Sequence, residues 1–200
     1  MASNARTARR SSAETREHVL DVAERLFYWD GIRATGVDKI ALEAGVAPTT
    51  LYRLFASKDD LVAAYVDRFA AQYRDWVDTL TSTPDASARE RILALFDGLA
   101  GNTGPDSFRG CPFLMALAEY PDPESPAHIS AQAVKAWVRA KLHQLVGQLP
   151  GLTPRAQSVA GDQLALVVEG IYASTAALGT EGPARSARSL AALVLDSAAG

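Results

Sequence analysis

Apolar residues recur every three or four positions along most of the chain, with polar residues between them. This spacing puts the apolar side chains on one face of a helix, whereas a half-buried strand needs strict alternation. The first such stripe consists of Val19, Val22, Ala23, Leu26 and Phe27. Ser11 and Glu14 have capping-box spacing before it, and Gly31 marks its expected end. We therefore predict a helix between these signals.

Two short helical patterns follow, in residues 38–44 and 48–55. Gly45 can take the left-handed conformation that ends a helix, and Pro48 suits the first turn of the next helix because no partner for its N–H is needed there. Leu51 and Phe55 lie one turn apart and are expected to face inward. This arrangement is typical of the helix-turn-helix, whose second helix enters the major groove of DNA. An ordinary helical hairpin with a solvated outer face has the same spacing.

The outward face of the second short helix carries side chains that suit DNA, namely Thr49, Thr50, Tyr52 and Arg53. Hydroxyl groups can bond phosphates, and an Arg side chain can bond a guanine edge through two nitrogens. Residues 1–10 lack apolar periodicity and are expected to be disordered. Their Arg6, Arg9 and Arg10 suit a basic arm that follows the DNA backbone or enters the minor groove, or they belong to a solvated tail.

The remaining chain predicts six further helices, separated by turns rich in Pro and Gly, at about 58–80, 86–100, 110–120, 127–149, 154–178 and 183–198. The fold class is therefore all-α, with about nine helices. No apolar run approaches the roughly 18 residues of a membrane span, and the first 18 residues are polar, unlike a secretory signal. The single cysteine, Cys111, excludes an internal disulfide framework and fits a reducing cytoplasm, so we expect a cytoplasmic protein without a membrane partner.

The net charge of −3 does not by itself favour nucleic acid. Residues 1–74 hold 11 basic and 10 acidic side chains, whereas residues 75–200 hold 9 and 13, so a basic face must be local. The chain contains no GxSxG, HExxH, CxxC or Walker-type spacing. His128 and His143 have no partners at metal-ligand spacing. We therefore expect no catalytic residues, no metal and no cofactor, with a helical enzyme as an alternative.

Residues 14–69 resemble the DNA-binding domain of the TetR family of transcriptional regulators. The positions that match the family pattern are Ala23, Phe27, Gly31, Thr35, Val37, Ile40-Ala41, Ala44-Gly45-Val46, Thr50-Leu51-Tyr52, Phe55, Ser57-Lys58 and Leu61. The match covers the first third of the chain, and the rest agrees only in general plan. The resemblance implies a DNA-binding head in residues 13–57, after a disordered basic tail in residues 1–12, and a helical ligand-binding and dimerisation domain in residues 58–200.

The resemblance also implies how the head contacts DNA. Thr35, Thr50, Tyr52 and Lys58 would bond phosphates, and Thr49, Tyr52 and Arg53 would read bases. Lys58 would share a phosphate with a helix N-terminus, since a cation there otherwise opposes the helix dipole. Three positions depart from the common family pattern, namely Gly36, Pro48 and Leu54. Because these residues offer no side-chain donor, more of the contact rests on Thr49, Thr50, Tyr52 and Arg53.

A second resemblance lies in residues 110–113, where a Gly-Cys-Pro-Phe segment like that of a family subset leads into an apolar helix. By analogy, a small apolar effector would enter a pocket lined by Tyr65, Phe69, Tyr73, Trp76, Phe96, Phe113, Met115, Glu119, Trp137 and Tyr172. Each of these residues also fits a plain core position. Glu119 is either a polar anchor in the pocket or an exposed helix end. Cys111 is either a small buried residue or a redox-sensing thiol.

The last two predicted helices are poor in charge, with 3 basic and 4 acidic residues among the 47 positions of 154–200. By resemblance, about residues 154–198 pair with the same helices of a second subunit, and such a dimer suits a palindromic operator. They would otherwise be the core of a monomer. The sequence therefore predicts a ligand-responsive homodimeric regulator of transcription, most simply a repressor that an effector releases from double-stranded DNA. A regulator controlled by a protein partner is the alternative.

Overall fold

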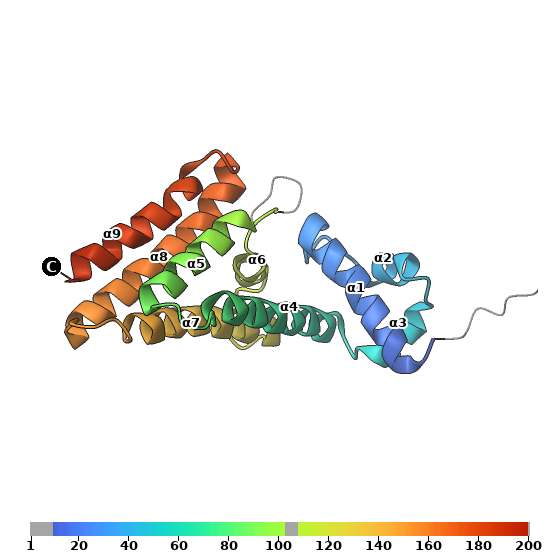
Figure 1. Ribbon diagram of the computed structural model, residues 1–200. Coiled ribbons are helices and arrows are strands. Elements are labelled where there is room, and N and C mark those ends of the chain that lie inside the picture. Colours follow the sequence, from blue (N-terminus) through green and yellow to red (C-terminus); the bar gives the residue numbers. More distant parts are fainter. Residues whose placement is uncertain (1–9, 103–107, 200) are drawn as a thin grey trace, which may run out of the picture. The chain divides into compact units, whose positions relative to one another are not determined.

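The computed structural model describes residues 10–102 and 108–199. Within these ranges the chain forms nine α-helices and one short 3-10 helix, which confirms the all-α prediction (Figure 1). The chain divides into two compact units, Met1–Tyr65 and Val66–Gly200. The predictions for Arg6 and Arg9 in the basic tail lie outside the described residues.

The first unit contains α1 (Ser12–Asp30), α2 (Val37–Glu43), α3 (Pro48–Leu54) and the first two turns of α4 (Lys58–Thr81). The predicted capping box begins α1, because the Glu14 amide donates to Ser11 Oγ at 3.2 Å and the Ser11 amide donates to Glu14 Oε2 at 2.7 Å. Gly45 follows α2 with a φ of +64°, the left-handed conformation that its position predicted. The side chains of Phe27, Leu51 and Tyr65 are buried in this unit, and the rings of Phe27 and Tyr65 lie 5.6 Å apart.

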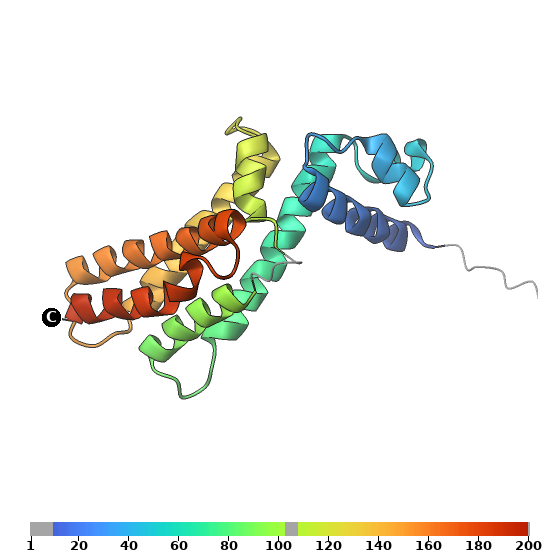
Figure 2. The same cartoon turned by 90° about the horizontal axis from the view of Figure 1, so that it is seen from above.

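The second unit contains the rest of α4, α5 (Ala88–Gly101), α6 (Pro112–Glu119), α7 (Pro126–Val146), α8 (Pro154–Leu178), η1 (Pro183–Ser186) and α9 (Ala187–Ala199). α8 and α9 lie side by side, as both views show (Figures 1 and 2), and α7 packs against α8. α5 packs against α7 and α9. The last predicted helix differs at its start, because residues 183–186 form a 3-10 turn before α9 begins. Such tighter turns are frequent at helix N-termini.

No helix among the described residues is long and apolar enough to cross a membrane.

The division between the two units falls inside α4, after Tyr65, whereas the sequence predicts a domain boundary between residues 57 and 58.

Candidate nucleic-acid interface

The exposed face of α3 follows from what anchors its opposite face. Leu51 and Phe55 are buried, so they attach the helix to the rest of the first unit, as predicted. Pro48 occupies the first turn, and the Thr50 amide donates to the Ala47 carbonyl at 2.8 Å to close that turn. The side chains on the opposite side of the helix are therefore directed away from the core.

Three predicted base-reading residues lie on this face. Thr49 and Arg53 are exposed, and 49% of the Tyr52 surface is accessible. Thr49, Tyr52 and Arg53 have the i, i+3 and i+4 spacing that groups side chains on one face of a helix. Thr50 lies at the edge of this face and is half-buried. The arrangement can offer two hydroxyls and a guanidinium together to a ligand such as a DNA groove.

The two remaining predicted contacts lie outside α3. Lys58 begins α4, and its Nζ donates to the Arg33 carbonyl at 3.4 Å, so the ammonium lies beside the loop that precedes α2. Thr35 is fully buried, and its hydroxyl donates to the Leu26 carbonyl at 3.4 Å. The structure therefore does not bring the Thr35 side chain to the exposed face of α3. Its hydroxyl ties the loop to the end of α1.

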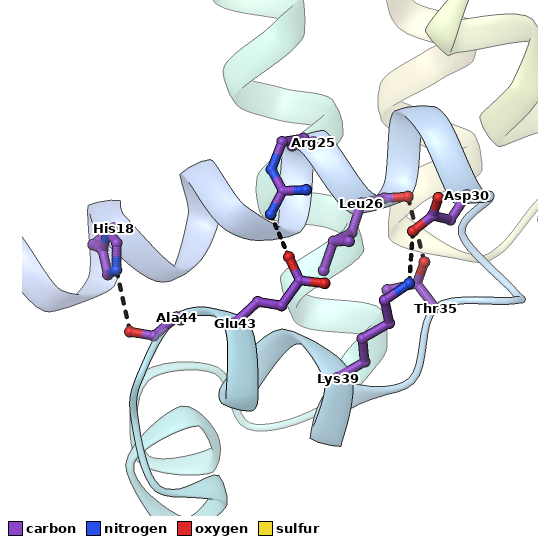
Figure 3. Close-up of polar contacts among 8 residues, drawn as sticks. All are labelled: His18, Arg25, Leu26, Asp30, Thr35, Lys39, Glu43 and Ala44. Atoms are coloured by element: carbon purple, nitrogen blue, oxygen red, sulfur yellow. Dashed lines mark hydrogen bonds and ion pairs between the residues drawn. The ribbon is translucent and has the colours of Figure 1, made fainter.

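Polar contacts join α1 to α2 and to the residues beside it, as Figure 3 shows. The ammonium of Lys39 donates to Asp30 Oδ2 at 2.8 Å, and this hydrogen bond raises the pKa of Lys39. Arg25 pairs with Glu43 at the end of α2. His18 Nε2 lies 3.1 Å from the Ala44 carbonyl oxygen. The sequence pattern gave no signal for these pairs, because the partners lie 9 to 26 positions apart.

In the second unit, five of the ten predicted pocket residues form one aromatic cluster, which consists of Phe69, Tyr73, Trp76, Phe113 and Tyr172. The Phe113 ring centroid lies 5.5 Å from that of Phe69 and 5.6 Å from that of Tyr73, and the Tyr73 and Trp76 rings lie 5.7 Å apart. Tyr172 donates its hydroxyl to that of Tyr73 at 3.1 Å. Burial raises the pKa of both phenols, so both hydroxyls stay protonated at neutral pH.

The other five predicted pocket residues have other surroundings. Tyr65 belongs to the first unit and packs against Phe27, and Phe96 is fully buried on α5. The Arg74 guanidinium lies over the Trp137 ring at 5.9 Å from its centroid. Met115 and Glu119 are half-buried on α6.

A partly buried ion pair borders the aromatic cluster, and the sequence pattern did not indicate it. Lys135 Nζ on α7 lies 2.8 Å from Glu169 Oε2 on α8 and 5.6 Å from the centroid of the Tyr172 ring. The same ammonium donates to Cys111 Sγ at 3.3 Å. Cys111 is 5% exposed, so it is a buried residue with a basic neighbour that its sequence neighbours did not reveal.

An apolar hollow of about 380 Å³ lies on α8, η1 and α9. Its lining includes Leu166, Ile171, Pro183 and Leu190, and none of the ten predicted pocket residues is among the lining side chains. Four leucines of α8 and α9 are also largely exposed, namely Leu166 (71%), Leu178 (63%), Leu190 (47%) and Leu193 (61%). A group of exposed leucines beside an apolar hollow is typical of a face that another molecule covers.

Comparison with known proteins gives a consistent result. Residues 19–65 match the family model described as "Bacterial regulatory proteins, tetR family". The chain is 26% identical over 155 residues to the HTH-type transcriptional regulator YjdC of Escherichia coli, covering 78% of this chain and 80% of that protein. It is 39% identical over 85 residues to the HTH-type transcriptional repressor KstR2 of Mycobacterium tuberculosis, covering 40% of each chain. Among solved structures, SCO4454 of Streptomyces coelicolor, a TetR-family transcriptional regulator, is 30% identical, with a TM-score of 0.85 over 94% of this chain and 97% of that one.

Proposed function

The chain belongs to the TetR family of DNA-binding transcriptional regulators, and we propose that it is a homodimeric repressor that a small apolar effector releases from a palindromic operator. The family consists of regulators and not of enzymes, in agreement with the absence of catalytic motifs from the sequence. The observation that carries the proposal is the exposed face of α3 with Thr49, Tyr52 and Arg53.

The side chains of this face have separate roles in the proposal. Arg53 and Tyr52 read base edges in the major groove together with Thr49, and Thr50 and Lys58 bond phosphates. Lys58 suits a phosphate because it begins α4, where the helix N-terminus also favours an anion. Thr35 is left out, because its buried hydroxyl is already directed at the Leu26 carbonyl.

Two alanine variants test this division of roles. Arg53→Ala is expected to change base preference at particular positions of the operator, at about 1–3 kcal/mol for a lost bidentate contact. Lys58→Ala is expected to weaken binding to every duplex and to lower the slope of log K against log salt by about one unit. Binding to a set of single-base operator variants at several salt concentrations measures both effects. Equal losses for both variants on every duplex would contradict the division.

The proposed dimer rests on the exposed leucines of α8 and α9 and on the hollow beside them. A second copy of the chain offers the same face, so a two-fold arrangement would cover both sets of leucines at once. Two copies would also present two α3 helices, which a palindromic operator with half-sites about 34–36 Å apart requires. Light scattering of the purified protein at micromolar concentration is expected to give twice the chain mass, and a monomer would contradict the proposal.

The proposed effector site is the aromatic cluster of the second unit, with its five members as candidate lining. The close ring pairs and the partly buried hydroxyl pair of Tyr73 and Tyr172 support it, because an apolar ligand with one polar group would find matching partners there. The effector must bind the arrangement that does not bind DNA more tightly than the one that does. About 1.4 kcal/mol of such preference is enough to weaken DNA binding tenfold.

A screen of small apolar compounds by thermal unfolding tests the effector proposal. A true effector is expected to raise the melting temperature of the free protein and, at the same concentration, to raise the Kd for the operator. A compound that stabilises the protein without any change in operator affinity is not an effector. If no compound of this class has either effect, control by a protein partner becomes the better account.

A further inference from the structure

His18 of α1 contacts the turn of the helix-turn-helix, and this contact has no role in the function described above. Its Nε2 lies 3.1 Å from the carbonyl oxygen of Ala44, the residue that follows α2 (Figure 3). We propose that His18 is a positioning residue for DNA recognition, which fixes the α2–α3 turn and thereby the direction in which α3 is presented. The inference rests on the proposal that α3 reads the operator.

The place of Ala44 explains why one hydrogen bond matters there. Ala44 is the C-cap of α2, and the carbonyls in the last turn of a helix have no partner within that helix. Gly45 then reverses the chain with a positive φ, and α3 begins at Pro48. Two backbone hydrogen bonds close this turn, from the Gly45 amide to the Leu42 carbonyl at 3.1 Å and from the Val46 amide to the Ala41 carbonyl at 3.0 Å. The hydrogen bond from His18 to the Ala44 carbonyl ties the closed turn to α1.

Two ion pairs and one ring contact also connect α1 to α2 and to the end of α3. Lys39 pairs with Asp30 and Glu43 pairs with Arg25, both as exposed pairs, and exposed pairs contribute little to stability. The Arg16 guanidinium lies 4.6 Å from the centroid of the Phe55 ring, beyond the last residue of α3. Glu43 is the last residue of α2, so its exposed ion pair lies next to the turn, whereas His18 bonds the backbone of the turn itself at Ala44.

A turn that is fixed before binding costs less to order on the operator. Without the donor, the carbonyl of Ala44 exchanges its protein partner for water, and α3 samples more directions around Gly45. Specific binding then falls, because base contacts need one direction of α3. Non-specific binding changes little, because it rests on phosphate contacts that many orientations permit.

Three variants of the full-length protein test the inference. His18→Leu removes the donor and keeps a side chain of similar bulk. His18→Gln keeps an amide N–H near the position of Nε2. His128→Leu is the matched control, because His128 Nδ1 makes the same kind of bond to the Tyr120 carbonyl, at 2.8 Å, in the second unit. The probes are a duplex that the wild-type protein selects from a random library and a scrambled duplex of the same length, each at several salt concentrations below the melting temperature of every variant.

We expect His18→Leu to raise the Kd for the selected duplex about three- to tenfold, the range that loss of one ordinary hydrogen bond gives. Its Kd for the scrambled duplex and its salt slope stay at the wild-type values, and His18→Gln restores most of the loss. His128→Leu binds both duplexes as the wild type does. A salt slope that falls by about one would overturn the inference and make His18 a phosphate contact. Equal losses on both duplexes, no loss, or no rescue by Gln would overturn it as well. If Arg53→Ala also left base preference unchanged, the proposed role of α3 itself would fail.

Discussion

The proposed dimer predicts a large effect from a single charge on α8. Leu166 is 71% exposed in the chain and lines the apolar hollow, so a second copy would cover most of its side chain. Replacing it with Glu puts a carboxylate on the surface that must leave water when two chains associate. A carboxylate buried without a partner is strongly unfavourable, and therefore Leu166→Glu is expected to favour the monomer.

The magnitude follows from the exposed area. Full burial of a leucine side chain is worth about 1.5–3 kcal/mol, so covering the exposed part of Leu166 contributes about 1–2 kcal/mol. A two-fold interface contains this residue twice, which gives about 2–4 kcal/mol per dimer before any cost of burying the charge. Loss of this apolar contribution alone should therefore raise the dimer Kd by roughly 30- to 1,000-fold.

Sedimentation equilibrium over a wide concentration range measures this Kd directly. The control is Leu42→Glu, which adds the same charge at an 80% exposed leucine of α2, outside the proposed interface. The control is expected to associate as the wild type does, whereas Leu166→Glu shifts to monomer and loses affinity for a palindromic duplex. Wild-type association by Leu166→Glu would refute the assignment of α8 to the interface.

Two further substitutions test the contacts between α7 and α8. Gly161→Ala should lower the melting temperature, at a cost of about 1–3 kcal/mol, because the new Cβ would lie 2.7 Å from His143 Cδ2. The control, Gly101→Ala, should not lower it, because no described residue lies within 4 Å of the Cβ added there. Hydrogen bonds from Arg139, and to a smaller extent from His143, lower the pKa of Asp162 to about 2. The ionised carboxylate therefore stabilises the fold above about pH 4, and this contribution is lost as the pH falls towards 2. Asp162→Asn should therefore flatten the dependence of melting temperature on pH between 4 and 2, and an unchanged slope there would contradict the role given to Asp162.

Local signals in the sequence predicted the elements well where one segment decides the outcome. Ser11 and Glu14 form the predicted capping box, Gly45 has the expected positive φ, and α8 runs from Pro154 to Leu178 as the pattern indicated. Each of these features depends on residues within one or two turns of the chain. The family resemblance was likewise carried by a dense local pattern, and the family model matches residues 19–65 within it.

Local sequence signals did not predict the contacts between distant segments of the chain. Lys135 and Glu169 lie 34 positions apart, and nothing near either residue in the sequence indicates a partly buried ion pair beside Tyr172. Thr35 fits the family pattern for a phosphate contact, but only the packing of the loop against α1 shows that its hydroxyl is enclosed. His18 looks like an ordinary polar residue on the edge of the α1 stripe, and its partner is a backbone carbonyl that no sequence pattern marks.

The crystal structure of the protein bound to its selected duplex is the most direct test of the central claim. The account predicts two chains joined through α8 and α9, with one α3 from each chain in successive major grooves about 34–36 Å apart. Arg53 and Tyr52 should then lie within hydrogen-bond distance of base edges. A complex in which α3 faces away from the duplex, or in which one chain alone occupies the site, would contradict the account.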